Sequence, residues 1–191
     1  MKKLIRPVLM LFILISIVTG LLYPLAVTGI AQIVFPEQAS GSLLKRGDEI
    51  IGSDLIGQNF SGLNYFWGRP SATSPNPYNA ANSGGSNLGP TNPALIEAVS
   101  DRIKHLRVHH PGKEEKIPTD LVTTSASGLD PHISPAAAYY QLERVAAARN
   151  IDAAIIKSLI DQLIEGPQLG VLGDPRINVL RLNLALDALQ K

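Results

Sequence analysis

The sequence contains one group of residue types that hydrolytic enzymes use. Ser125, Ser127, Asp130 and His132 lie close together in the chain, and serine, histidine and aspartate can together activate a hydroxyl nucleophile. Such triads are normally assembled from separate elements, and no Gly-x-Ser-x-Gly turn exposes either serine. The simpler interpretation is that Ser127 and Asp130 hydrogen-bond loop backbone before a helix. We predict no catalytic residues and retain a membrane-anchored extracytoplasmic hydrolase as the alternative.

Two further patterns are weaker. His105 and His109 are four residues apart and share a helix face, but no Glu follows His105 as in zinc proteases, and cationic side chains are common at a helix end. The segment Ser83 to Asn87 offers backbone amides to an anion, yet it lacks the Gly-Lys-Ser/Thr ending of a phosphate loop. Leu55 to Gln58 matches only a fragment of nucleotide-handling signatures. The sequence therefore predicts neither a metal site nor a tightly bound cofactor.

Composition excludes other classes. The chain has no cysteine, which removes disulfides, thiolate nucleophiles and cysteine-ligated zinc. Residues 37–191 carry 14 cationic and 16 acidic side chains, and this balance argues against nucleic-acid binding. Because the sequence also shows no convincing nucleophile-base pair, metal cage or phosphate loop, a binding or assembly subunit becomes the favoured class.

The first element of the chain is an uncharged run from Pro7 to Pro36, and it is preceded by Lys2, Lys3 and Arg6. The run is long enough for one membrane-spanning helix, which we place at residues 7–35. Because cations gather on the short N-terminal side, the basic tip 1–6 is expected in the cytoplasm and residues 36–191 outside it. The alternative is a cleaved secretory signal, as in a solute-binding protein.

Two features of this run bear on partner helices. Ser16 and Gly20 form a small-xxx-small pair, which allows another helix to approach closely. The alternative is that Gly20 only loosens a helix that bends at Pro24. Ser16, Gly20 and Pro24 are thus the candidate positions for packing against a partner.

Beyond the run, the pattern predicts one α+β domain and does not decide how the strands of its sheet are connected. Residues 41–60 suggest a hairpin with its turn at Gly47-Asp48. Residues 61–93 form a connection rich in Gly, Pro, Asn and Ser, and its aromatic residues favour a packed, functional loop. Helices are expected from Asn92-Pro93, Ser134-Pro135 and Asp152, with a last one at 183–190. Short strands are expected at 121–124 and 177–180.

Several segments together resemble the KdpC subunit family of bacterial potassium-transporting P-type ATPases. They include Thr19-Gly20, Tyr23-Pro24, Gly41 to Leu43, Ser53 to Phe60, Tyr65-Phe66, Gly68 to Ala72, Ser83 to Asn92, Thr124 to Asp130, Arg144 to Arg149 and Asn178 to Leu186. The candidate family-motif surface comprises Gly57, Gln58, Phe60, Gly68, Arg69, Pro70, Gly84, Gly85, Asn87, Ser127, Gly128 and Asp130.

The resemblance implies an accessory subunit of an ATP-driven potassium uptake complex in the bacterial inner membrane. Its partners would be a channel-like potassium-binding subunit, a P-type ATP-hydrolysing subunit and a small membrane peptide. The family is described as a catalytic chaperone that raises the ATP affinity of the hydrolytic subunit. The cations before the apolar run place residues 36–191 outside the cytoplasm, so we expect the effect on ATP affinity to be indirect. We also expect this chain to stabilise the complex or its outer potassium entrance.

Overall fold

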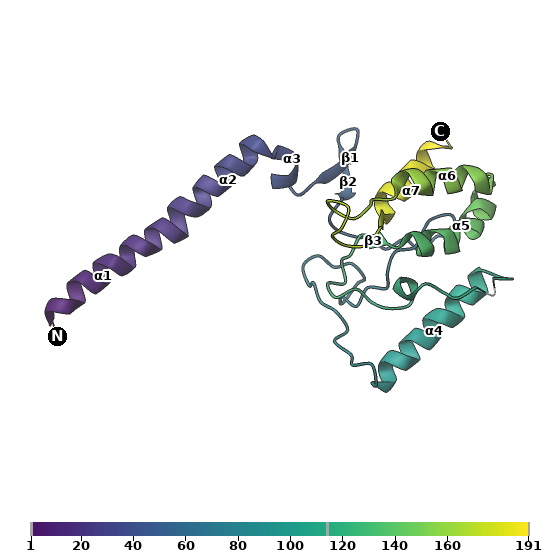
Figure 1. Cartoon of the computed structure of the whole chain (residues 1–191), viewed down its shortest axis with the longest axis horizontal. Helices are drawn as coiled ribbons and strands as arrows, with labels where there is room; N and C mark the ends of the chain where they lie inside the picture. The colour runs from purple at the N-terminus through teal and green to yellow at the C-terminus, as the bar shows by residue number, and fades with distance from the viewer. Residues whose placement is uncertain (1, 114, 191) are drawn as a thin grey trace. The chain divides into compact units, whose positions relative to one another are not determined.

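The structure, a computed structural model, describes residues 2–113 and 115–190. Contacts divide the chain into two compact units, residues 1–51 and 52–191. The first unit contains one apolar helix, and the second is a helical domain with small pieces of sheet (Figure 1). This confirms the predicted fold class of an N-terminal apolar helix followed by an α+β domain.

The apolar helix runs through α1 (Lys2–Ile17), the π-helical turn η1 (Val18–Leu22) and α2 (Tyr23–Val34). Its segment Leu4–Val34 is long and apolar enough to cross a membrane, and none of its apolar window is buried. The π-helical turn ends two residues before Pro24, which has no N–H to donate to the preceding turn. Gly20 lies in this wider turn and has open space around it, and Ser16 lies two residues before the turn.

A hairpin follows the short helix α3 (Pro36–Ala39). Strands β1 (Leu43–Arg46) and β2 (Glu49–Ser53) pair with each other. The connection contains Gly47 at a positive φ of 63°, a conformation that glycine adopts without strain. The predicted hairpin and its turn are confirmed.

Three long helices begin as their capping residues predict. The helices are α4 (Pro93–His109), α5 (Pro135–Arg149) and α6 (Ala153–Leu163). The side chains of Asn92, Ser134 and Asp152 accept backbone N–H bonds at the three starts, and Asn150 ends α5 in a left-handed conformation. In Figure 1, α5 and α6 form the predicted helical hairpin, with α7 (Val179–Ala188) packed on α6.

The strand predicted at 121–124 is wrong. Residues Thr119–Leu121 form the 3-10 helix η2, and both the N–H and the hydroxyl of Thr123 donate to the carbonyl of Thr119. Local hydrogen bonds thus turn the chain, while Leu121 and Val122 enter the core. Branched residues indicated burial correctly but the wrong backbone conformation.

The strand predicted at 177–180 is only two residues long. Strand β4 (Ile177–Asn178) pairs antiparallel with β3 (His132–Ile133). It ends there because the Asn178 side chain accepts from the N–H of Arg181 and caps α7. The last helix consequently starts four residues earlier than the sequence indicated.

Candidate functional site

Residues 54–92 contain no helix or strand, yet part of this connection is firmly held. The backbone N–H of Phe66 donates to Asn183 Oδ1 at 2.8 Å, and Asn183 Nδ2 donates back to the Phe66 carbonyl at 2.9 Å. Gln141 makes the same pair of bonds to Trp67, at 2.8 and 3.1 Å. Two side-chain amides thus replace the neighbouring strand that this extended segment lacks. They fix both rings in the core, where Phe66 is fully buried.

Arg144 strengthens the same attachment. Its guanidinium lies 3.9 Å from the centre of the Trp67 ring. It donates to the carbonyl oxygens of Leu63 and Tyr65, and its Nε donates to His110 Nε2 at 3.1 Å. Burial lowers the pKa of Arg144 to about 10, so the side chain stays cationic at neutral pH. One buried cation therefore joins the loop, helix α4 and helix α5.

His110 is held as the neutral imidazole. Arginine can only donate, so His110 Nε2 accepts and Nδ1 must donate to the Leu106 carbonyl, 2.8 Å away. Burial lowers the pKa of His110 from 6.5 to about 4; the bond to Leu106 opposes this shift, and the charge of Arg144 adds to it.

We expect this histidine to make stability depend on pH. Because the pKa of His110 is lower in the folded chain, the unfolded chain binds the proton first. Its stabilising contribution is complete above pH 6.5 and is lost as the pH falls towards 4, by about 1.4 kcal/mol per pH unit. Urea unfolding of the full chain in detergent, repeated across this range, measures the slope. His110→Gln should reduce the slope by one proton, and an unchanged slope would assign the dependence to other groups.

Close backbone packing joins the next loops. A side chain at Gly57 would lie 2.4 Å from the Tyr78 ring and 2.7 Å from the carbonyl of Asp130, and one at Gly68 would lie 2.6 Å from the Tyr78 hydroxyl. That hydroxyl donates to the Arg69 carbonyl at 2.6 Å. Burial raises the pKa of Tyr78 to about 12, which keeps the donor protonated.

Gly85 and Gly128 hold a second crossing of loops. A side chain at Gly85 would lie 2.8 Å from the carbonyl of Ala126, and one at Gly128 would lie 2.7 Å from the carbonyl of Gly84. Gly128 also has a positive φ of 68°. The N–H of Gly84 donates to the carbonyl of Ser127 at 2.8 Å. We call the segments 57–60, 67–73, 78–79, 83–85 and 124–130 the loop assembly.

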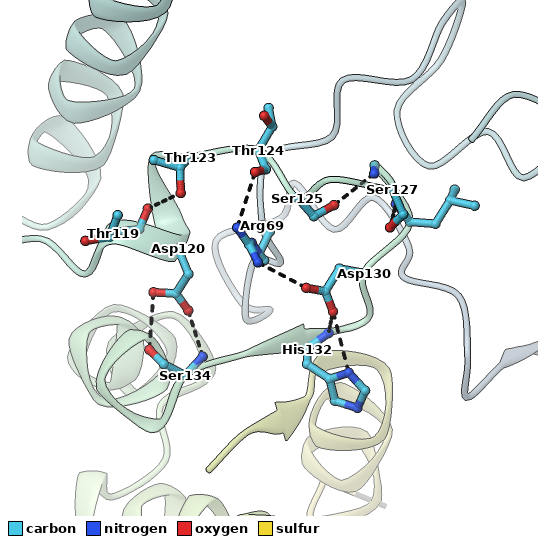
Figure 2. A network of polar contacts seen from close by, with 12 residues as sticks. Arg69, Thr119, Asp120, Thr123, Thr124, Ser125, Ser127, Asp130, His132 and Ser134 are labelled. Carbon is cyan, nitrogen blue, oxygen red and sulfur yellow. Dashed lines mark hydrogen bonds and ion pairs between the residues drawn. The ribbon is translucent and has the colours of Figure 1, made fainter. Parts of the chain in front are cut away.

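Arg69 ties the loop assembly together. It donates to Asp130 Oδ2 and to the carbonyl of Thr124, both at 3.2 Å (Figure 2). The other carboxylate oxygen of Asp130 accepts from the N–H of His132 at 3.0 Å and lies 3.5 Å from its Nδ1. Burial would raise the pKa of Asp130, but the bonds from His132 and Arg69 outweigh it and hold the pKa below its ordinary value.

The two serines serve the loop backbone. Ser125 Oγ accepts from the N–H of Gly128 at 2.9 Å, and Ser127 Oγ accepts from the N–H of Leu129 at 3.1 Å. Figure 2 shows both hydroxyls engaged away from His132. The structure confirms the interpretation that Ser127 and Asp130 bind loop backbone before a helix.

His105 and His109 do share a helix face, as predicted. Their ring centres are 4.4 Å apart, and both rings lie within 5.5 Å of the Trp67 ring centre. His109 Nδ1 is 2.8 Å from the carbonyl of His105. Within residues 2–113 and 115–190, no group of three or more His, Cys, Asp or Glu side chains could hold a metal ion.

A cavity of about 450 Å³ opens between the loop assembly and α4. The residues that line it include the aromatic Phe60, Trp67 and Tyr78 and the cationic Arg69 and Arg102. Five of the sequence-predicted surface residues line it: Gln58, Phe60, Gly68, Arg69 and Pro70. It is the place where most of the predicted motif residues on 57–70 converge.

The remaining predicted residues have other places. Gly84, Gly85, Ser127, Gly128 and Asp130 lie in the second loop crossing and the Arg69 network. Asn87 has a positive φ of 52° but lies outside the loop assembly. Ser16, Gly20 and Pro24 lie in the apolar helix of the first unit.

The sequence analysis missed Gln141 and Asn183, whose side chains hold Trp67 and Phe66 in place. Gln141 and Asn183 are fully or almost fully buried polar residues on helices. The only signal was their position: a polar side chain on the apolar face of a predicted helix needs a partner when buried. Arg102 was missed because it stands among other charges on α4, and its neighbours cannot be known before the loops are placed.

These features define a class: a chain with one apolar helix that is long enough to cross a membrane, followed by a domain whose loops border a cavity. A family model described as "K+-transporting ATPase, c chain" matches residues 5–188. The chain therefore belongs to the KdpC family of potassium-transporting ATPase subunits, which confirms the resemblance seen in the sequence.

Relatives named potassium-transporting ATPase KdpC subunit agree with this membership. The protein from Dechloromonas aromatica is 59% identical over 191 residues, all of both chains. The one from Polaromonas naphthalenivorans is 58% identical over 190 residues, covering 100% of this chain and 97% of the relative. The one from Methylococcus capsulatus is 53% identical, covering 97% of each. The match therefore extends over the whole length and includes the loop assembly.

Proposed function

We propose that this chain is an accessory, non-catalytic subunit that helps to assemble and stabilise a potassium-uptake ATPase. The observation that carries the proposal is the family match over residues 5–188, and the cavity beside the loop assembly supports it. Its partners are a channel-like potassium-binding subunit, a P-type ATP-hydrolysing subunit and a small membrane peptide. Ser16, Gly20 and Pro24 are the positions at which its helix contacts partner helices.

The basic residues before the apolar helix support a cytoplasmic N-terminus and an extracytoplasmic domain. ATP is hydrolysed in the cytoplasm, because that is where ATP is available. Any effect of this subunit on ATP affinity is therefore transmitted through membrane contacts, and the domain acts at the outer potassium entrance. Neither ATP nor potassium needs a tight site on this chain for such a role.

Co-purification tests the assembly role. Two large membrane subunits and a small peptide are expected to co-purify with the tagged full chain. Potassium-stimulated ATP hydrolysis should require all of these subunits. Isolated full-length chain should be inert towards ATP, esters and peptides. Ester or peptide hydrolysis that disappears in Ser127→Ala or His132→Ala would instead establish the hydrolase alternative.

The absence of cysteine allows a direct test of orientation. Lys116 is exposed, so Lys116→Cys introduces a single reactive thiol into the domain. A membrane-impermeant maleimide added to intact spheroplasts should label this variant, whereas labelling only after lysis would place the domain in the cytoplasm. The unsubstituted chain is the matched control, since it has no thiol to react.

A further inference from the structure

The charges that line the cavity are not all balanced. The Arg69 charge is paired with Asp130, and Asp101 at the rim is paired with Lys104 at 2.9 Å. Arg102 is different: its Nη1 donates to the carbonyl of Val122 at 2.8 Å, and it has no ion pair in the part of the chain that the structure describes. Among the cavity's lining residues that the structure describes, Arg102 therefore carries a positive charge without a counter-charge.

The surroundings of Arg102 make that charge available for a ligand. It is half-buried on α4, and burial lowers its pKa, which reflects partial loss of water around the guanidinium. Among residues 2–113 and 115–190, only its Nη1 has a hydrogen-bond acceptor, so four further N–H groups of the guanidinium have no acceptor there. A partly dehydrated guanidinium is stabilised by an oxyanion that accepts two parallel hydrogen bonds from it.

We propose that this cavity receives an acidic side chain from another subunit of the potassium-transporting complex, and that the carboxylate pairs with Arg102. The inference rests on the proposed function as an assembly subunit. One unpaired guanidinium matches the single charge of Asp or Glu, whereas a polyphosphate would need several cations. The aromatic walls of Phe60 and Trp67 accommodate the apolar part of the incoming segment.

Retention of the chain in the purified complex tests the pairing. Arg102→Gln and Arg102→Glu should weaken retention of the full chain about tenfold or more during a salt wash, since an interfacial carboxylate would lose its partner. Arg107→Gln is the matched control, because Arg107 is exposed on the same helix outside the cavity. Equal losses in Arg102→Gln and Arg107→Gln would overturn the proposal. Thermal unfolding of each isolated variant checks that the domain still folds.

A second variant identifies the partner carboxylate directly. Arg102→Lys keeps the charge and places an amine at this position of the cavity. A carbodiimide should activate the partner's Asp or Glu, and attack by the amine should form an amide bond and release the carbodiimide as its urea. Mass spectrometry should then find one intersubunit link that the unsubstituted complex lacks. Lys104 serves as the internal reference for links formed at the rim. A complex that assembles but yields no new link at position 102 would refute the proposal and leave the assembly role intact.

Discussion

Arg144→Met is expected to lower the free energy of unfolding by about 3–5 kcal/mol, since several buried acceptors lose their donor at once. The carbonyls of Leu63 and Tyr65 and the imidazole of His110 all receive bonds from this one guanidinium. Methionine keeps much of the apolar stem but cannot donate. Urea unfolding of the full chain in detergent, followed by circular dichroism, measures the loss.

Two further variants separate the geometry of Arg144 from its charge. Arg144→Lys keeps a cation but cannot reproduce the stack on Trp67 or the forked bonds, so it should be nearly as destabilising as methionine. Arg107→Met removes an exposed arginine from α4 and should cost less than about 0.5 kcal/mol. If Arg144→Lys unfolded like the unsubstituted chain, the charge alone would account for the stability.

Gly128→Ala is expected to disrupt the loop assembly and cost about 2–4 kcal/mol. An L-residue at a positive φ of 68° costs roughly 1–2 kcal/mol. The new methyl group would also lie 2.6 Å from Thr73 and 2.7 Å from the carbonyl of Gly84, so the loops must move apart. Unfolding of the full chain and the yield of assembled complex measure the two consequences.

Gly112→Ala is the matched control for Gly128→Ala. Gly112 has a similar positive φ of 80°, but nothing lies within 4 Å of an added side chain. Its substitution should therefore show the backbone cost alone, about 1–2 kcal/mol. Equal losses at the two positions would mean that the close approach of the loops contributes nothing to stability.

Local signals in the sequence predicted much of the fold. Asn92, Ser134 and Asp152 mark helix starts through hydrogen bonds made within one turn, so no knowledge of the rest of the chain is needed. The hairpin turn at Gly47 is equally local. The segment 121–124 was mistaken because branched residues are common both in strands and in other buried segments.

The candidate site could be predicted only in part. Motif resemblance identified Arg69, Gly128 and Asp130, which the structure places in the loop assembly. It could not give the role of Gln141 or Asn183, because each bonds to backbone more than 70 residues away in the chain. Such contacts depend on how the helices and loops pack, and no local pattern in the sequence encodes them.

The hydrogen bonds from the Asn183 and Gln141 amides to Phe66 and Trp67 also imply an order of events during synthesis. Phe66 is separated from Asn183 by 117 residues, so this bond cannot form before the ribosome has synthesised that whole intervening stretch. The apolar helix leaves the ribosome long before that moment. Phe66 therefore lacks its partner Asn183 while the apolar helix is already available for membrane insertion.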